Sequence, residues 1–117
     1  MHHFQTYYPS YRRPAIETHT ASLSKNGVLR FPHLDYRNLG SPPFVRLLFD
    51  PDNLAIGIQA TSREDPASLA VNSKHSKSAV RVAAEGFRRR FGLQGGGTER
   101  YPIVLEDETL VIELPKP

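Results

Sequence analysis

Apolar and polar residues alternate with a period of two along several short stretches of this chain, and each stretch ends in a turn or a short helix. The clearest case runs from Ser78 to Gly92. Val80 and Val82 alternate with more polar neighbours, as in a half-buried strand. The apolar spacing then changes to three and four residues, which is one face of a helix, and Gly92 is a typical C-terminal cap. This pattern predicts a strand that leads into a basic helix at about 83–91.

Residues 22–58 predict a similar order of elements. Asn26 and Gly27 favour a tight turn between two short strands. The second strand, residues 28–31, alternates so that Arg30 points away from its apolar face.

A short helix and a hairpin complete this part of the chain. The helix is predicted at about 33–39 and ends at Gly40. Two apolar runs follow within residues 44–58, joined by the turn-forming residues 50–53. These runs predict a β-hairpin.

The order of elements repeats. Four pairs of segments match in the same sequence order: 28–31 with 79–82, 39–40 with 91–92, 47–49 with 103–105, and 50–58 with 106–114. The last two pairs, which form the predicted hairpins, align without a gap. We therefore predict an α+β, mostly β, fold with two pseudo-equivalent β-β-α-β-β halves, residues 22–60 and 68–114, joined by a linker at 61–67. Together they form a single compact domain over residues 19–117, because a half of about 40 residues cannot bury its apolar faces alone.

The predicted core consists of apolar residues from both halves. They are Leu29, Phe31, Leu48, Val80, Val82, Phe87, Val104, Leu110 and Ile112. Residues 1–18 lie outside it, because their aromatic and basic composition has no periodic apolar face, and we expect a flexible arm there.

Composition restricts the class of protein. The 15 Lys and Arg residues exceed the 12 Asp and Glu residues, which gives a formal charge of +3, and Cys is absent, which excludes disulfides and thiolate metal sites. No apolar run approaches the roughly 20 residues of a membrane span, and the N-terminus lacks a signal-peptide core. We expect a soluble cytoplasmic protein.

Candidate catalytic and metal chemistry is sparse. The histidines (His2, His3, His19, His33 and His75) lack metal-site spacing. Acidic residues gather at 50–53 and 106–108, where an acid and base pair or a cation site is conceivable, but such residues are ordinary turn formers. Gly95 to Gly97 lacks the following Lys and Ser or Thr of a phosphate loop and is interpreted as a linker. We expect no enzyme activity, metal or cofactor.

Positive charge is concentrated in the second half. Residues 74–100 hold seven Lys or Arg against two Glu, a net +5 that exceeds the charge of the whole chain. Such a distribution favours a surface that binds a polyanion. For the run of Arg88 to Arg90 the alternative is a solvated helix face on which Glu85 pairs with Arg89 at a spacing of four.

The repeated unit resembles the swapped-hairpin DNA-binding domain of AbrB-type regulators and MazE-type antitoxins. The residues that carry the resemblance in the first half are Lys25, Gly27, Arg30, Phe31, Pro32, Leu39 and Gly40. In the second half, residues 78–82 (SAVRV) are similar to the Ser-x-x-Val-Arg-Ile strand of antitoxin domains, although Ala83 stands where that family usually has Pro and Lys77 where it has Gly or Asn. Two copies in one chain imply a tandem version similar to MraZ-like proteins.

These observations predict a small nucleic-acid-binding protein with a regulatory role, and double-stranded DNA as its partner. The residues expected to bind it are Lys25, Arg30, Lys74, Lys77, Arg81, Arg88 and Arg89. The alternatives are a non-enzymatic protein-interaction module, antitoxin-like or an adaptor, and a single-stranded nucleic-acid binder. The chain is expected to be a monomeric pseudo-dimer or a homodimer without membrane contact.

Overall fold

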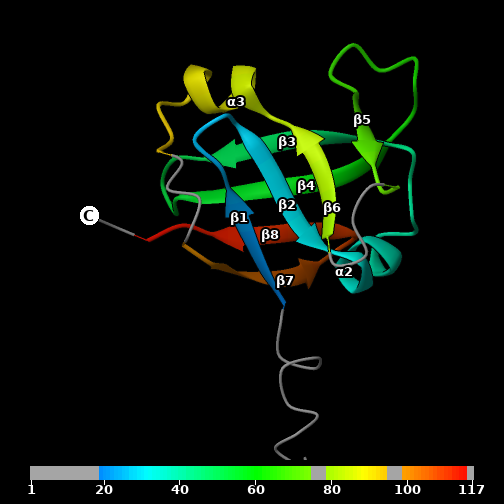
Figure 1. Cartoon of the computed structure of the whole chain (residues 1–117), viewed down its shortest axis with the longest axis horizontal. Coiled ribbons are helices and arrows are strands. Elements are labelled where there is room, and N and C mark those ends of the chain that lie inside the picture. The colour runs from blue at the N-terminus through cyan, green and yellow to red at the C-terminus, as the bar shows by residue number, and fades with distance from the viewer. Residues whose placement is uncertain (1–18, 75–78, 95–98, 116–117) are drawn as a thin grey trace, which may run out of the picture.

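The computed structural model describes residues 19–74, 79–94 and 99–115, and within them the chain forms a closed antiparallel barrel of eight short strands with two short helices (Figure 1). The elements are β1 (Thr20–Leu23), β2 (Val28–Pro32), α2 (His33–Asn38), β3 (Phe44–Asp50), β4 (Ala55–Thr61), β5 (Leu69–Asn72), β6 (Ala79–Ala83), α3 (Glu85–Arg90), β7 (Tyr101–Glu106) and β8 (Thr109–Glu113). The fold is therefore mostly β, as the alternating pattern predicts. The predicted arm at residues 1–18 lies outside the described residues.

The order of strands around the barrel differs from their order in the chain. It runs β1, β2, β6, β5, β3, β4, β8, β7 and back to β1. Strands β2 and β6 thus lie on the opposite side of the barrel from β4 and β8. In Figure 1, β1, β2 and β6 cross in front of β3, β4 and β8.

Alternation along the strands fills the interior of the barrel. The largest fully buried side chains are Phe31, Leu29, Ile56, Ile58, Leu110, Ile112, Val45, Val80 and Val82. Successive side chains of a strand point to opposite faces, so these residues face the interior while their neighbours face outward. Burial of these side chains is the main source of stability for a domain of this size.

Two predicted core positions are wrong. Leu48 and Val104 are 40% and 45% exposed. Both lie in strands in which consecutive residues are apolar, so the pattern does not reveal which side faces inward, and both face outward. Phe87 is partly buried and packs edge-on against Phe49 at a centroid distance of 6.4 Å.

The helices are close to prediction. α2 covers residues 33–38 of the predicted 33–39, whereas α3 begins at Glu85 because Ala83 still belongs to β6. Gly92 follows α3 at φ 65°, the left-handed conformation expected of a C-terminal cap.

The two hairpins differ in their turns. Asp50 pairs with Ala55 across a four-residue turn, whereas Glu106 pairs with Thr109 across a two-residue turn. The predicted gap-free match between the two hairpins therefore does not extend to their turns, which differ in length by two residues.

Candidate functional site

The two strand-borne arginines meet at the centre of the β2–β6 ladder. The register places Arg30 directly opposite Arg81. In both strands the flanking residues are buried, so the two arginines project from the outer side of the barrel wall. Opposite residues in an antiparallel pair have Cα atoms about 4.5 to 5.5 Å apart, so the two guanidinium groups originate close together.

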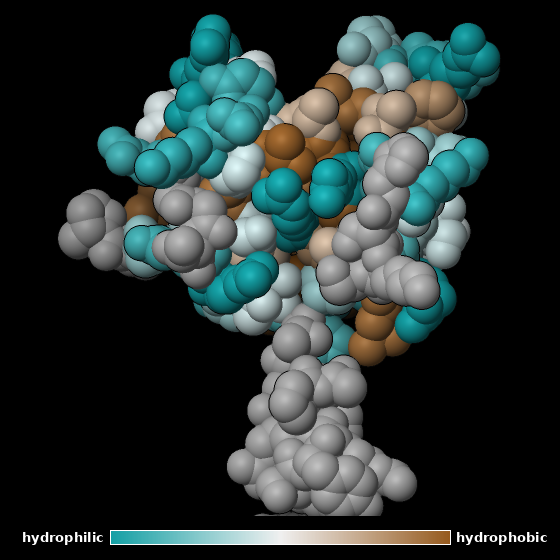
Figure 2. All heavy atoms as spheres, viewed as in Figure 1, coloured by the Kyte–Doolittle hydropathy of each residue, from teal (hydrophilic) through white to brown (hydrophobic). Residues whose placement is uncertain are grey.

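The remainder of this outer surface is small or uncharged. The ladder pairs Val28 with Ala83 on one side of the arginines and Pro32 with Ala79 on the other. We call the outward side of β1, β2, β6 and β5 the arginine wall. Figure 2, drawn from the same side as Figure 1, shows hydrophilic residues at the centre of this face beside hydrophobic ones.

The arginines are part of a polar row across four strands. Ser22 of β1 is opposite Arg30, and Asn72 of β5 is opposite Arg81. Sequence reasoning did not select Ser22 or Asn72, because only the pairing between strands aligns them with the arginines.

Neither arginine is neutralised by the described part of the chain. No ion pair involves Arg30 or Arg81 there, and the buried Nε of Arg81 has no hydrogen-bond partner. Like charges directly opposite each other in a ladder are destabilising. Among the described residues, the guanidinium groups of Arg30 and Arg81 therefore lack a carboxylate partner that would compete with a bound anion.

Two of the predicted lysines, Lys25 and Lys74, are at the edges of this wall. Lys25 lies exposed in the turn between β1 and β2, and this turn contacts the start of α3, where the Ala84 N–H donates to the Gly27 carbonyl at 2.7 Å. Lys74 is exposed two residues after β5. Lys77 lies outside the described residues.

Arg88 and Arg89 of α3 are paired with a carboxylate of the same helix. The carboxylate of Glu85 accepts hydrogen bonds from Arg88 Nη2 and Arg89 Nε, each at 2.7 Å. Arg88 Nη1 also donates to the Leu93 carbonyl at 3.2 Å. These hydrogen bonds lower the pKa of Glu85 to about 2 and raise that of Arg88. Arg88 and Arg89 are thus partly neutralised, as the pairing of Glu85 with Arg89 anticipates.

Arg90 was not predicted as a site residue, yet it has no carboxylate partner among the described residues. Its guanidinium lies 6.0 Å from the centre of the Phe91 ring, and Phe91 is 43% exposed. The spacing of four identified Arg89 as a partner of Glu85, but it did not show that Glu85 also binds Arg88 and leaves Arg90.

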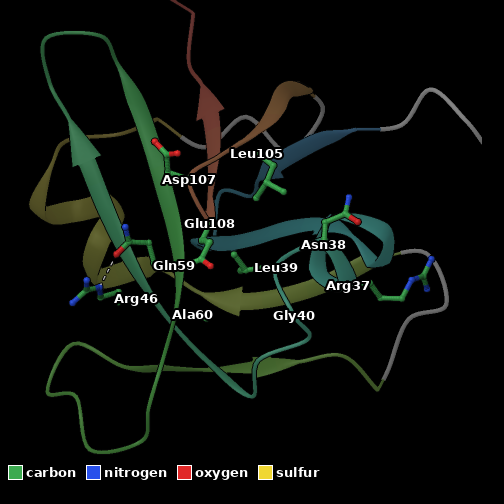
Figure 3. A pocket seen from close by; sticks show the side chains of 10 residues that line it. All are labelled: Arg37, Asn38, Leu39, Gly40, Arg46, Gln59, Ala60, Leu105, Asp107 and Glu108. Carbon is green, nitrogen blue, oxygen red and sulfur yellow. Dashed lines mark hydrogen bonds between the residues drawn. The ribbon is translucent and has the colours of Figure 1, made fainter.

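A cleft of about 720 Å³ lies between the end of α2 and the β7–β8 turn (Figure 3). Arg37 and Arg46 line it together with Asp107 and Glu108. The mixed charges do not favour a polyanion. Asp107 and Glu108 form the turn itself, at φ 47° and 63°, which agrees with their interpretation as turn residues.

The described residues show no cluster of three metal-ligating side chains. None of their helices has the length and apolar character needed to cross a bilayer. Comparison of the chain with protein-family models, curated proteins and solved structures found no match.

Proposed function

We propose that this chain is a small DNA-binding protein that contacts duplex DNA through Arg30 and Arg81. The observation that carries the proposal is their register: two outward arginines lie directly opposite each other, without a carboxylate partner among the described residues, on a wall of short side chains. Arginine binds phosphate by paired hydrogen bonds and recognises the O6 and N7 atoms of guanine in the same way.

The strand pairing supports the two-halves interpretation that underlies this proposal. If β1 to β4 are exchanged with β5 to β8, every pair of neighbouring strands becomes another observed pair. β1 pairs with β7, and β5 pairs with β3, so the first strand of each half adds to the hairpin of the other. That exchange is what the resemblance to AbrB-type swapped-hairpin domains implies.

Under this exchange Arg30 corresponds to Arg81, because residues 28–31 match residues 79–82. In the β2–β6 ladder these two equivalent arginines lie directly opposite each other. On the opposite wall Ile56 faces its match Ile112. A local two-fold axis through both pairs would present the two guanidinium groups symmetrically to a duplex.

Electrostatics also support a polyanionic partner. Lys25 and Lys74 lie at the edges of the arginine wall, and Arg90 extends from the end of α3. Phosphate contacts of this kind supply affinity without sequence preference and make it fall with salt.

The proposal is tested by fluorescence anisotropy with labelled duplex and single-stranded DNA over a range of salt concentrations. Arg30→Ala and Arg81→Ala should each weaken duplex binding and reduce sequence discrimination, by about 1–3 kcal/mol where guanine is read. Lys74→Ala should weaken binding evenly across sequences and lower the salt slope by about one.

Arg63→Ala is the matched control, because Arg63 is exposed in the loop between β4 and β5 and its guanidinium makes no ion pair among the described residues. Replacing Arg30 or Arg81 should not lower the melting temperature, since it removes a like-charge pair. Absence of binding to both forms of DNA at low salt would refute the proposal and favour the protein-interaction module. Preference for single strands would favour stacking on an exposed ring such as Phe91.

A further inference from the structure

The wall opposite the arginines carries an exposed apolar row. The registers of three ladders align Leu48 of β3, Gly57 of β4, Val111 of β8 and Val104 of β7 across the barrel. We call these four residues the apolar row. Leu48 and Val104 at its two ends are 40% and 45% exposed.

A polar row lies directly beside it. The same ladders align Arg46, Gln59, Thr109 and Glu106. Arg46 Nε donates to Gln59 Oε1 at 2.9 Å, and Gln59 Nε2 donates to Thr109 Oγ1 at 2.9 Å (Figure 3 shows the first of these bonds). The bond to Gln59, and an ion pair of Arg46 Nη1 with Asp65 Oδ2 at 3.9 Å, hold the guanidinium of Arg46 at the β3 end of the row, while the carboxylate of Glu106 is exposed at the β7 end.

This surface is complementary to itself. A two-fold axis that runs parallel to the strands, between β4 and β8, exchanges the β3 end of one copy with the β7 end of the other. Arg46 of one copy then faces Glu106 of the second copy, and Leu48 faces Val104. Charged groups of opposite sign meet twice, once at each end.

Gly57 presents only backbone at the centre of the apolar row. A Cβ atom built on it would lie 3.2 Å from Thr109 Cγ2 and 3.5 Å from the Leu48 Cβ, so neighbouring side chains already occupy the space beside it. Under the same axis the outward side chain of Val111 from the second copy faces Gly57, and no side chain of Gly57 separates the two in dispersion contact.

We propose that the apolar row docks a second copy of this chain, in a symmetric face-to-face dimer of the two β3-β4-β8-β7 walls. Sheets that pack face to face with nearly aligned strands are a common arrangement. The arginine wall lies on the opposite side of the barrel and remains uncovered in the dimer.

The size of the surface sets the strength of the association. The apolar row and the polar row beside it, with residues about 4.8 Å apart between strands and about 6.8 Å apart along them, cover roughly 260 Å². A standard interface buries about 800 Å² on each partner, so the dimer should be weak and concentration-dependent.

Sedimentation velocity of the full chain, from low micromolar to millimolar protein, tests the proposal. The wild type should pass from monomer to dimer over this range. Arg46→Glu or Glu106→Arg alone should weaken dimerisation by about tenfold, because each creates two like-charge contacts. The double variant Arg46→Glu, Glu106→Arg should restore it to within about threefold of the wild type, because opposite charges again meet across the dimer. The melting temperature reports separately the loss of the ion pair between Arg46 and Asp65.

Arg63→Glu and Glu64→Arg make the same charge changes in the exposed loop between β4 and β5 and should leave dimerisation unchanged. Melting temperature establishes that each variant is folded. A chain that stays monomeric at every concentration would overturn the proposal, and so would a dimer that ignores the charge reversals or is not restored by the double variant. A monomer whose apolar row binds a different protein would also overturn it, because another occupant would then cover this surface.

Discussion

Substituting Gly27 by Ala should destabilise the protein more than any other Gly→Ala change among the glycines whose surroundings the structure describes. Gly27 has φ +77°, which costs an L-residue about 1–2 kcal/mol. An added Cβ would also lie 2.5 Å from Glu85 Cα, closer than real Cβ atoms approach another residue, and the near neighbour is backbone. The β1–β2 turn or the start of α3 must therefore move.

That movement has a second cost. The carbonyl of Gly27 accepts the hydrogen bond from Ala84 N–H at 2.7 Å, and losing such a bond costs about 0.5–1.5 kcal/mol. The sum is about 1.5–3.5 kcal/mol in the free energy of unfolding. At about 4 °C for each kcal/mol, the melting temperature should fall by roughly 6–14 °C.

Two other glycines provide matched controls in urea and thermal unfolding. Gly40 has φ +97° but nothing within 4 Å of a built Cβ, so Gly40→Ala should show only the backbone cost of about 1–2 kcal/mol. Gly86, inside α3, has an open surrounding and no positive φ, so Gly86→Ala should stabilise by about 0.5–1 kcal/mol. If Gly27→Ala costs no more than Gly40→Ala, the contact between the turn and α3 is refuted.

Two further predictions concern side chains that hold the helices in place. The pKa of Glu85 is lowered from 4.5 to about 2 by its hydrogen bonds to Arg88 and Arg89, so the stabilisation it gives is present above pH 4.5 and is lost as the pH falls towards about 2. The stability difference between the wild type and Glu85→Gln, measured by urea unfolding, should therefore shrink over that interval; a constant difference would contradict the pairing. Tyr36→Phe removes the hydroxyl that donates to the Pro42 carbonyl at 2.6 Å in a buried position and should cost about 1–2 kcal/mol, whereas an unchanged stability would show that water or a shifted loop replaces the bond.

Local features of the fold were accessible from the sequence because they depend on neighbouring residues. Asn26 and Gly27 do form a tight turn, with the Gly27 N–H donating to the Ser24 carbonyl at 3.0 Å. The change of period after Val82 correctly placed α3 within one or two residues at each end. The outward direction of Arg30 also followed from alternation with its buried neighbours.

Pairing between distant strands was less accessible. The predicted core included Leu48 and Val104 because β3 and β7 contain consecutive apolar residues, and a period of two cannot tell which side is buried when both are apolar. The two-residue turn at Asp107 and Glu108 places Glu108 at a positive φ, where Gly is usual at the second turn position. The length of this turn therefore had no clear signal in the sequence.

For the candidate site, too, local features followed from the sequence whereas contacts between distant residues did not. Composition revealed the charge excess of residues 74–100, but only the ladder places Arg30 opposite Arg81, and only the helix contacts show that Glu85 holds Arg88 as well as Arg89. Side-chain contacts decide which charges are available for a ligand. A count of basic residues cannot show which of them are already paired.

The two proposed surfaces can be tested independently because they lie on opposite walls of one barrel. Inward residues of both walls form a single core, so outward residues can change without loss of the fold, provided that alternation is kept. Arg30→Ala should therefore leave dimerisation intact, and Arg46→Glu should leave each monomer able to contact DNA. If one substitution abolished both properties in a folded protein, dimerisation and DNA contact would have to share a surface, and the assignment of separate functions to the two walls would be wrong.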